Sequence, residues 1–135
     1  MKVTLHGAAS DVTGSAYHVQ TDKASILVDC GFFQGMKRAD ELNVLPRGLN
    51  ARRLDAVLVT HAHLDHTGRL PILVKSGFRG KIHSTPATVE LADLILRDSA
   101  KVQAQDIERV NRKRERAGQK LLKPLYNIED VEATL

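Results

Sequence analysis

The sequence predicts a mixed α/β fold in which several strands end at one common edge. Apolar runs and polar–apolar alternation in the first half indicate strands, whereas helical spacing of apolar residues dominates after residue 68. One short strand, at 81–84, separates the predicted helices. A polar loop follows the buried strand at 55–60, which places reactive side chains at the strand-end edge.

The strands are predicted from their alternation and from the turns between them. Residues 2–6 alternate polar and apolar, which is typical of a strand with one covered face. Residues 16–20 and 25–29 indicate a hairpin that turns at Thr21-Asp22-Lys23. A short helix is expected around residues 37–42, within an irregular stretch.

Proline positions predict where two helices begin. Pro71 is tolerated only in a first helical turn, so a helix begins between Gly68 and Pro71 and ends at Gly77. Thr85 as N-cap and Pro86 begin a longer helix.

The apolar side of that longer helix extends through residue 110, with or without a break. Asn127 to Asp130 resembles the capped start of a last helix at 129–135.

The composition limits the class of protein. The 135 residues suffice for one domain or one piece of a larger one, and 42% hydrophobic residues suffice for an aliphatic core. A formal charge of +4 favours anionic partners such as nucleic acid, although many enzymes have a similar charge. The single cysteine, Cys30, excludes an internal disulfide and a Cys-rich zinc site, which fits a reducing, cytoplasmic setting. No membrane-spanning run and no signal-peptide core is present.

The segment from Thr60 to Gly68 has the highest density of potential metal ligands. His61 and His63 point the same way in an extended loop, because side chains alternate there. A turn can bring Asp65 and His66 to the same cavity from its other side. Packing gives no reason for so many titratable groups beside a buried strand. Neutral imidazoles with a carboxylate suit zinc or a similar metal, and two ligands on each side of the turn suit two metals better than one.

The predicted chemistry is metal-assisted hydrolysis. A bound zinc ion lowers the pKa of its water to about 7, and a pair of metals can polarise a phosphoryl or carbonyl oxygen. Asp65 can bind one metal and also orient the attacking hydroxide. Asp29 ends an apolar strand, where it either orients the His/Asp loop from behind or caps a turn. Spacing alone leaves both roles of Asp29 open.

The other polar residues have structural interpretations. Cys30 is expected to be a small buried residue. The three remaining histidines are expected to stand alone as ordinary residues: His6, His18 and His83. The basic segment 109–123 is expected to be a solvated helix face, and its lack of aromatic residues argues against stacking of single-stranded bases.

Several segments together resemble one protein family. The run from His61 to His66 matches the H-x-H-x-D-H motif of the metallo-β-lactamase fold. Three further segments resemble the N-terminal part of its β-CASP branch: Gly7 to Ser15, Leu27 to Gly35, and Thr67 to Pro71. That branch includes RNA-processing nucleases related to the endonuclease subunit of the cleavage and polyadenylation machinery. The resemblance covers essentially the whole chain and is closest to prokaryotic RNA hydrolases or exonucleases.

The resemblance implies an αββα sandwich of the α/β class, of which residues 1–135 form the N-terminal half. It implies that His61 and His63 bind one zinc ion and that Asp65 and His66 bind a second. It also matches Asp29 to the first acid of the family pattern, which supports the orienting role. The implied reaction is hydrolysis of RNA phosphodiester bonds.

The resemblance also implies that part of the site is missing from this sequence. Family members add a further histidine, a metal-bridging aspartate and a later histidine, and they have a second half-sandwich and a β-CASP domain. We therefore expect a fragment that holds fewer than two zinc ions and is inactive alone. Its uncovered sheet face is expected to cause self-association or to bind a complementing chain.

Two alternatives stay open. One is another hydrolase of the same fold, acting on thioesters or lactones, although the segments Val12 to Ser15 and Phe33 to Gly35 argue against it. The other is a non-catalytic remnant that binds nucleic acid or a protein partner, which the missing ligands favour.

Overall fold

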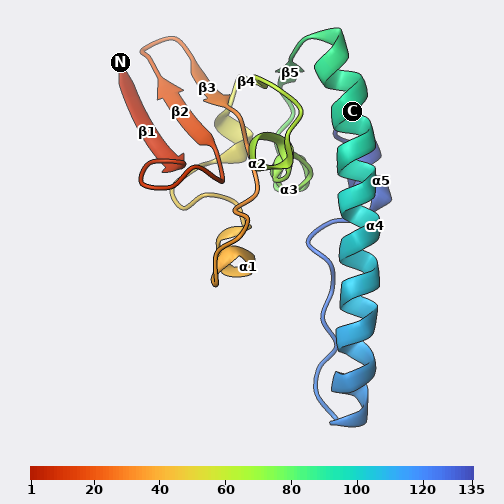
Figure 1. Cartoon of the computed structure of the whole chain (residues 1–135). Helices are drawn as coiled ribbons and strands as arrows, with labels where there is room; N and C mark the ends of the chain where they lie inside the picture. The colour runs from red at the N-terminus through yellow and green to blue at the C-terminus, as the bar shows by residue number, and fades with distance from the viewer.

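Five strands form one mixed sheet in the computed structural model, which describes residues 1–135 (Figure 1). Strands β1 (Lys2–Gly7), β2 (Ala16–Gln20) and β3 (Ser25–Val28) pair antiparallel. Strands β4 (Ala56–Leu58) and β5 (Lys81–His83) continue the sheet in parallel. Because β3, β4 and β5 run parallel, their carboxyl ends meet at one edge, as the sequence predicts.

Six helical segments surround or extend this sheet. They are α1 (Ala39–Leu42), the 3-10 turn η1 (Ala51–Arg53), α2 (Leu64–Thr67), α3 (Leu70–Lys75), α4 (Pro86–Arg116) and α5 (Ile128–Glu132). Thr85 caps α4 by accepting a hydrogen bond from the Thr88 N–H, and Pro86 is its first residue, as predicted. Asn127 and Asp130 form a capping box at the start of α5. No helix combines the length and the apolar character that crossing a membrane requires.

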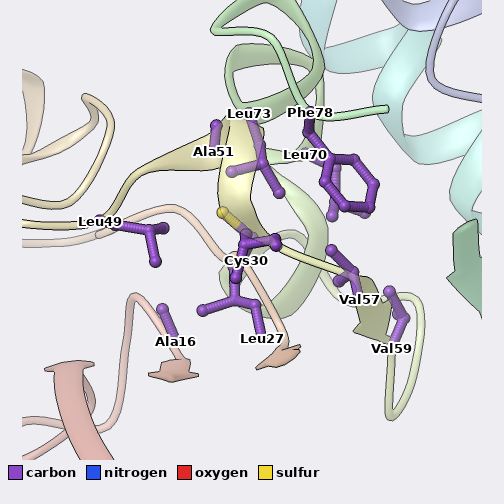
Figure 2. Packing of buried hydrophobic residues seen from close by; sticks show 11 residues of the cluster. Ala16, Leu27, Cys30, Leu49, Ala51, Val57, Val59, Leu70, Leu73 and Phe78 are labelled. Carbon is purple, nitrogen blue, oxygen red and sulfur yellow. The ribbon is translucent and has the colours of Figure 1, made fainter. Parts of the chain in front are cut away.

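The main core lies between one face of the sheet and the segments that cover it. Ala16, Leu27 and Val57 from three adjacent strands are fully buried against Leu73 of α3 and against Phe78 (Figure 2). A second cluster joins α4 and α5 to the rest of the molecule: Phe32, Leu96, Ala100, Tyr126 and Val131. The main core is almost entirely aliphatic, as the scarcity of aromatic residues predicts.

The opposite face of the sheet is apolar and open to solvent. Val3 and Leu5 on β1 are 52% and 55% exposed, and Leu58 on β4 is 40% exposed. Their strand partners, among them Tyr17 and Val28, are only partly buried. An apolar sheet face of this kind normally packs against another layer.

Several elements differ from the sequence predictions. The strand expected at 25–29 ends at Val28, because Asp29 has a positive φ of 59° that leaves the strand. Helix α4 extends to Arg116, beyond the apolar pattern that runs through residue 110, and it has no break. His6 and His18 do not stand alone, because their rings stack 6.0 Å apart and His18 Nε2 lies 2.8 Å from Ser25 Oγ. The last helix begins one residue earlier than predicted and ends at Glu132.

Candidate metal centre

The predicted ligands gather at the strand-end edge of the sheet. His61 and His63 lie in the loop after β4, and Asp65 and His66 lie on α2. The His61 ring is 3.9 Å from the His66 ring and 4.7 Å from the His63 ring, centroid to centroid. The Asp65 carboxylate is 3.6 Å from His66 Nε2. The structure thus brings all four side chains together, with the short helix α2 at the place where the sequence suggests a turn.

The donor set fits zinc in its chemistry, but its present arrangement is not a closed coordination shell. Three imidazoles and one carboxylate are the ligands that zinc prefers when thiolates are absent. No group of three or more donors surrounds a common point closely enough to hold an ion. The His61 Nδ1 lies 3.0 Å from the Thr60 hydroxyl. Because that hydroxyl donates its hydrogen to Asp29, it can only accept from a His61 Nδ1–H, which leaves the His61 Nε2 free to bind a metal.

Asp29 lies directly behind this cluster. Its carboxylate is 2% exposed, and it accepts hydrogen bonds from the Thr60 N–H at 2.8 Å and the Thr60 hydroxyl at 2.9 Å. The His66 Nδ1 lies 2.8 Å from Asp29 Oδ2. When Nδ1–H donates to Asp29, the His66 Nε2 keeps its lone pair free and the ring orientation is fixed. A turn-capping acid would not need the contact with His66, so this contact favours the orienting role of Asp29.

The backbone of Asp29 has a positive φ of 59°, and hydrogen bonds to its side chain stabilise this conformation. A positive φ is uncommon outside glycine, although aspartate tolerates it better than most residues. The side-chain bonds to Thr60 and His66 stabilise this conformation. Such strain is concentrated at functional sites, where the surrounding structure maintains it.

The segment Cys30 to Phe32 fixes α2 through backbone hydrogen bonds. The Cys30 N–H donates to the His66 carbonyl and the Phe32 N–H donates to the Leu64 carbonyl, both at 2.9 Å. A Cβ atom on Gly31 would lie 1.5 Å from the Asp65 carbonyl oxygen, so only glycine fits there. The two ligands on α2 therefore depend on close backbone contact with the residues after Asp29.

Arg69 is a structural residue that the sequence prediction missed. Its side chain is 2% exposed, and its guanidinium donates to the carbonyl groups of Gly31, Val44 and Gly14. It also lies 4.9 Å from the centre of the Phe33 ring. Burial lowers the pKa of this guanidinium from its ordinary value. Arg69 therefore joins three loops behind the metal centre.

Cys30 lies in the core, as expected, and is unsuited to bind a metal. Its thiol is fully buried among the aliphatic residues of the main core. Burial raises the pKa of the thiol to about 11, and the thiol is therefore neutral near pH 7. The ligands must consequently come from imidazole and carboxylate groups.

Comparison with known proteins places this chain in a family. The family described as the metallo-beta-lactamase superfamily matches residues 9–131. Ribonuclease TTHA0252 of Thermus thermophilus is 40% identical over 135 residues, which cover 100% of this chain and 27% of that protein. Transcription termination factor FttA of Cenarchaeum symbiosum is 40% identical over 106 residues, which cover 76% of this chain and 16% of that protein.

Among solved structures, the short form of human tRNase Z gives a TM-score of 0.47 at 21% identity. The alignment covers 90% of this chain and 42% of that chain. The chain spans about a quarter or less of the length of the ribonuclease and of the termination factor. The family match over residues 9–131 is decisive, and the chain belongs to the metallo-beta-lactamase superfamily.

Proposed function

We propose that this chain is the N-terminal portion of a zinc-dependent hydrolase of the β-CASP branch that cleaves RNA phosphodiester bonds. The observation that carries the proposal is the cluster of three histidines and Asp65, with Asp29 behind His66. A relative that is 40% identical over 135 residues is named a ribonuclease, which supports RNA as the substrate.

In this proposal, His61 and His63 hold one zinc ion, and Asp65 and His66 hold a second. A pair of bound metals lowers the pKa of a coordinated water and stabilises charge on the phosphoryl group under attack. With only these four ligands, the chain itself is expected to hold fewer than two zinc ions and to be inactive alone.

The residues of this chain orient the reaction. Asp29 fixes the tautomer and the ring plane of His66 through the Nδ1 contact at 2.8 Å. The Asp65 carboxylate accepts a hydrogen bond from the attacking water and so aligns it with the phosphorus. Thr60 keeps Asp29 in place through its N–H and its hydroxyl.

The proposal also assigns residues 1–135 to the first half of an αββα sandwich. Its support is the open apolar sheet face that includes Val3, Leu5 and Leu58. A second sheet layer, supplied by the same protein or by a complementing chain, would cover that face. Self-association through the same face is the expected behaviour of the chain alone. A cytoplasmic location belongs to this proposal, and the free, buried Cys30 is consistent with it.

Substitution of Asp29 by asparagine tests the orienting role. Asparagine can adopt the same backbone, but its neutral amide holds the His66 Nδ1–H less strongly than a carboxylate does. We expect zinc affinity to fall roughly 10–100-fold, which is typical of losing a residue that orients a metal ligand. Competition with a chromophoric zinc chelator measures this change. Asp40→Asn on the exposed surface of α1 is the matched control, and equal affinities in all three proteins would contradict the role.

A chimera tests the proposed reaction. This chain would replace the matching 135-residue segment of the Thermus thermophilus ribonuclease, to which it is 40% identical. We expect the chimera to cleave RNA and a chelator to abolish cleavage, whereas this chain alone shows no cleavage. An Asp65→Ala chimera controls for contaminating nucleases. A chimera that cleaves RNA no faster than the Asp65→Ala chimera, or whose cleavage survives chelation, would contradict the proposed function.

A further inference from the structure

An arm projects from the body of the molecule on the side where α4 ends. It consists of residues 104–125, which comprise the last turns of α4 and the extended segment that returns along it (Figure 1). None of these residues is buried. Hydrogen bonds tie the return segment to the helix, because the Asn111 side chain pairs with the backbone of Leu122 at 2.8 and 2.9 Å. We call residues 104–125 the basic arm.

The basic arm contains the entire excess of positive charge. It has seven basic and three acidic residues: Arg109, Arg112, Lys113, Arg114, Arg116, Lys120 and Lys123 against Asp106, Glu108 and Glu115. The whole chain has 20 basic and 16 acidic residues, which leaves thirteen of each outside the arm. The body is therefore neutral overall, and the field that attracts anions originates in the arm.

Most of these positive charges are not neutralised within the chain. Arg109 and Arg112 pair with acidic residues one turn earlier, at 3.8 and 2.7 Å. The other five basic residues of the arm form no salt bridge: Lys113, Arg114, Arg116, Lys120 and Lys123. Cations at a helix C-terminus stabilise its dipole, which explains the group at 113–116. That effect does not reach Lys120 and Lys123, which follow the helix.

We propose that the basic arm binds the phosphate backbone of RNA outside the metal centre. The inference rests on the proposed function, because it assigns a second contact to the same substrate. Helix α2 packs near Ser99 of α4, so Lys113 lies about 21 Å further along the helix at 1.5 Å per residue. Anchoring RNA at that distance holds the strand while another part of it enters the metal centre.

The contact is independent of base sequence. The arm has no aromatic residue, and neighbouring Tyr126 is fully buried, so no ring is available for base stacking. Unpaired lysine and arginine side chains on an exposed helix and its return segment suit phosphate groups. Binding is therefore expected to weaken steeply with salt.

Neutralising the unpaired cations tests the proposal. The arm variant is Lys113→Gln, Arg116→Gln, Lys120→Gln and Lys123→Gln in the full chain. The control variant removes the same charge from exposed positions on the body: Lys2→Gln, Lys23→Gln, Arg47→Gln and Arg53→Gln. Fluorescence anisotropy with a short unstructured RNA, in a chelator that prevents cleavage, measures the affinity at several salt concentrations.

The arm variant is expected to bind RNA roughly tenfold or more weakly than the unchanged chain. A plot of the logarithm of its RNA affinity against the logarithm of the salt concentration should be less steep by about 3, since each lost phosphate contact removes about 0.7 from the slope. The control variant should keep most of the affinity. Equal losses of RNA affinity in both variants would overturn the proposal. It would also be overturned if the arm bound anionic lipid vesicles, or a second copy of the chain, more tightly than it binds RNA. Because cleavage is tested separately in the chimera, failure of the arm proposal leaves the proposed function intact.

Discussion

Gly31→Ala is expected to lower the free energy of unfolding by about 3 kcal/mol or more. The new Cβ atom would lie 1.5 Å from the carbonyl oxygen of Asp65 and 1.9 Å from its carbonyl carbon. Both are backbone atoms of α2, so no flexible side chain can move aside. Either the chain fails to fold or α2 moves away from the segment after Asp29. Urea denaturation followed by circular dichroism measures the loss.

Gly35→Ala is the matched control for this substitution. Gly35 has a φ of +72°, and no atom lies within 4 Å of the place that a Cβ would take, so alanine there meets backbone strain but no clash. We expect a cost of about 1–2 kcal/mol, the usual cost of a left-handed alanine. If Gly31→Ala were no more destabilising than Gly35→Ala, the close contact between Gly31 and α2 would be wrong. Any folded Gly31→Ala protein should also bind zinc poorly, because Asp65 and His66 would be displaced.

His63→Ala is expected to remove most of the bound zinc. The chain is expected to hold fewer than two zinc ions, so its four donors share the bound metal, and the substitution deletes one of its three imidazole donors. The loss should exceed the roughly 10–100-fold weakening expected for Asp29→Asn, since a direct ligand is removed rather than an orienting partner. Elemental analysis after dialysis against a weak chelator measures the amount of zinc that each protein retains.

His83→Ala provides a stringent control for this result. His83 ends β5, next to β4 in the sheet and at the same strand-end edge, but its side chain is exposed and has no hydrogen bond or ring contact with the four candidate ligands. We expect this variant to retain the zinc content of the unchanged chain. A His63→Ala protein with undiminished zinc, or equal losses in both variants, would contradict the assignment of ligands.

Much of the fold follows from local sequence patterns. The strand Ala16–Gln20 and the start of α4 at Thr85 and Pro86 are confirmed, because alternation, capping and proline chemistry act over a few residues. Helix α2 could not be predicted in the same way. It has only four residues, too few for a helical pattern, and its position is fixed by hydrogen bonds from Cys30 and Phe32.

The site shows the same division between local and long-range information. The four potential ligands lie within six residues, so the motif alone predicts that they act together. The contact between Asp29 and His66 joins residues 37 positions apart and depends on a positive φ, neither of which spacing reveals. Arg69 lies in a segment that resembles the family, but its structural role could not be predicted, because its partners are backbone carbonyl groups, which every sequence supplies.

The basic arm shows what a charge run alone cannot predict. Residues 109–123 are expected from sequence to be a solvated helix face. None of them is buried, but the helix ends at Arg116 and residues 117–123 are not helical. Their return along α4 depends on the Asn111 contact with Leu122, which local propensity does not encode. The structure adds that this segment, which contains all of the net charge, projects from the body.

X-ray absorption at the zinc edge of the zinc-loaded chain tests the central claim most directly. A centre built from His61, His63, Asp65 and His66 predicts a shell of nitrogen and oxygen atoms at about 2.0–2.2 Å, with the outer scattering pattern of imidazole rings. The pattern should weaken in His63→Ala and stay unchanged in His83→Ala. A sulfur atom at about 2.3 Å, or a shell without imidazole scattering, would contradict this metal centre.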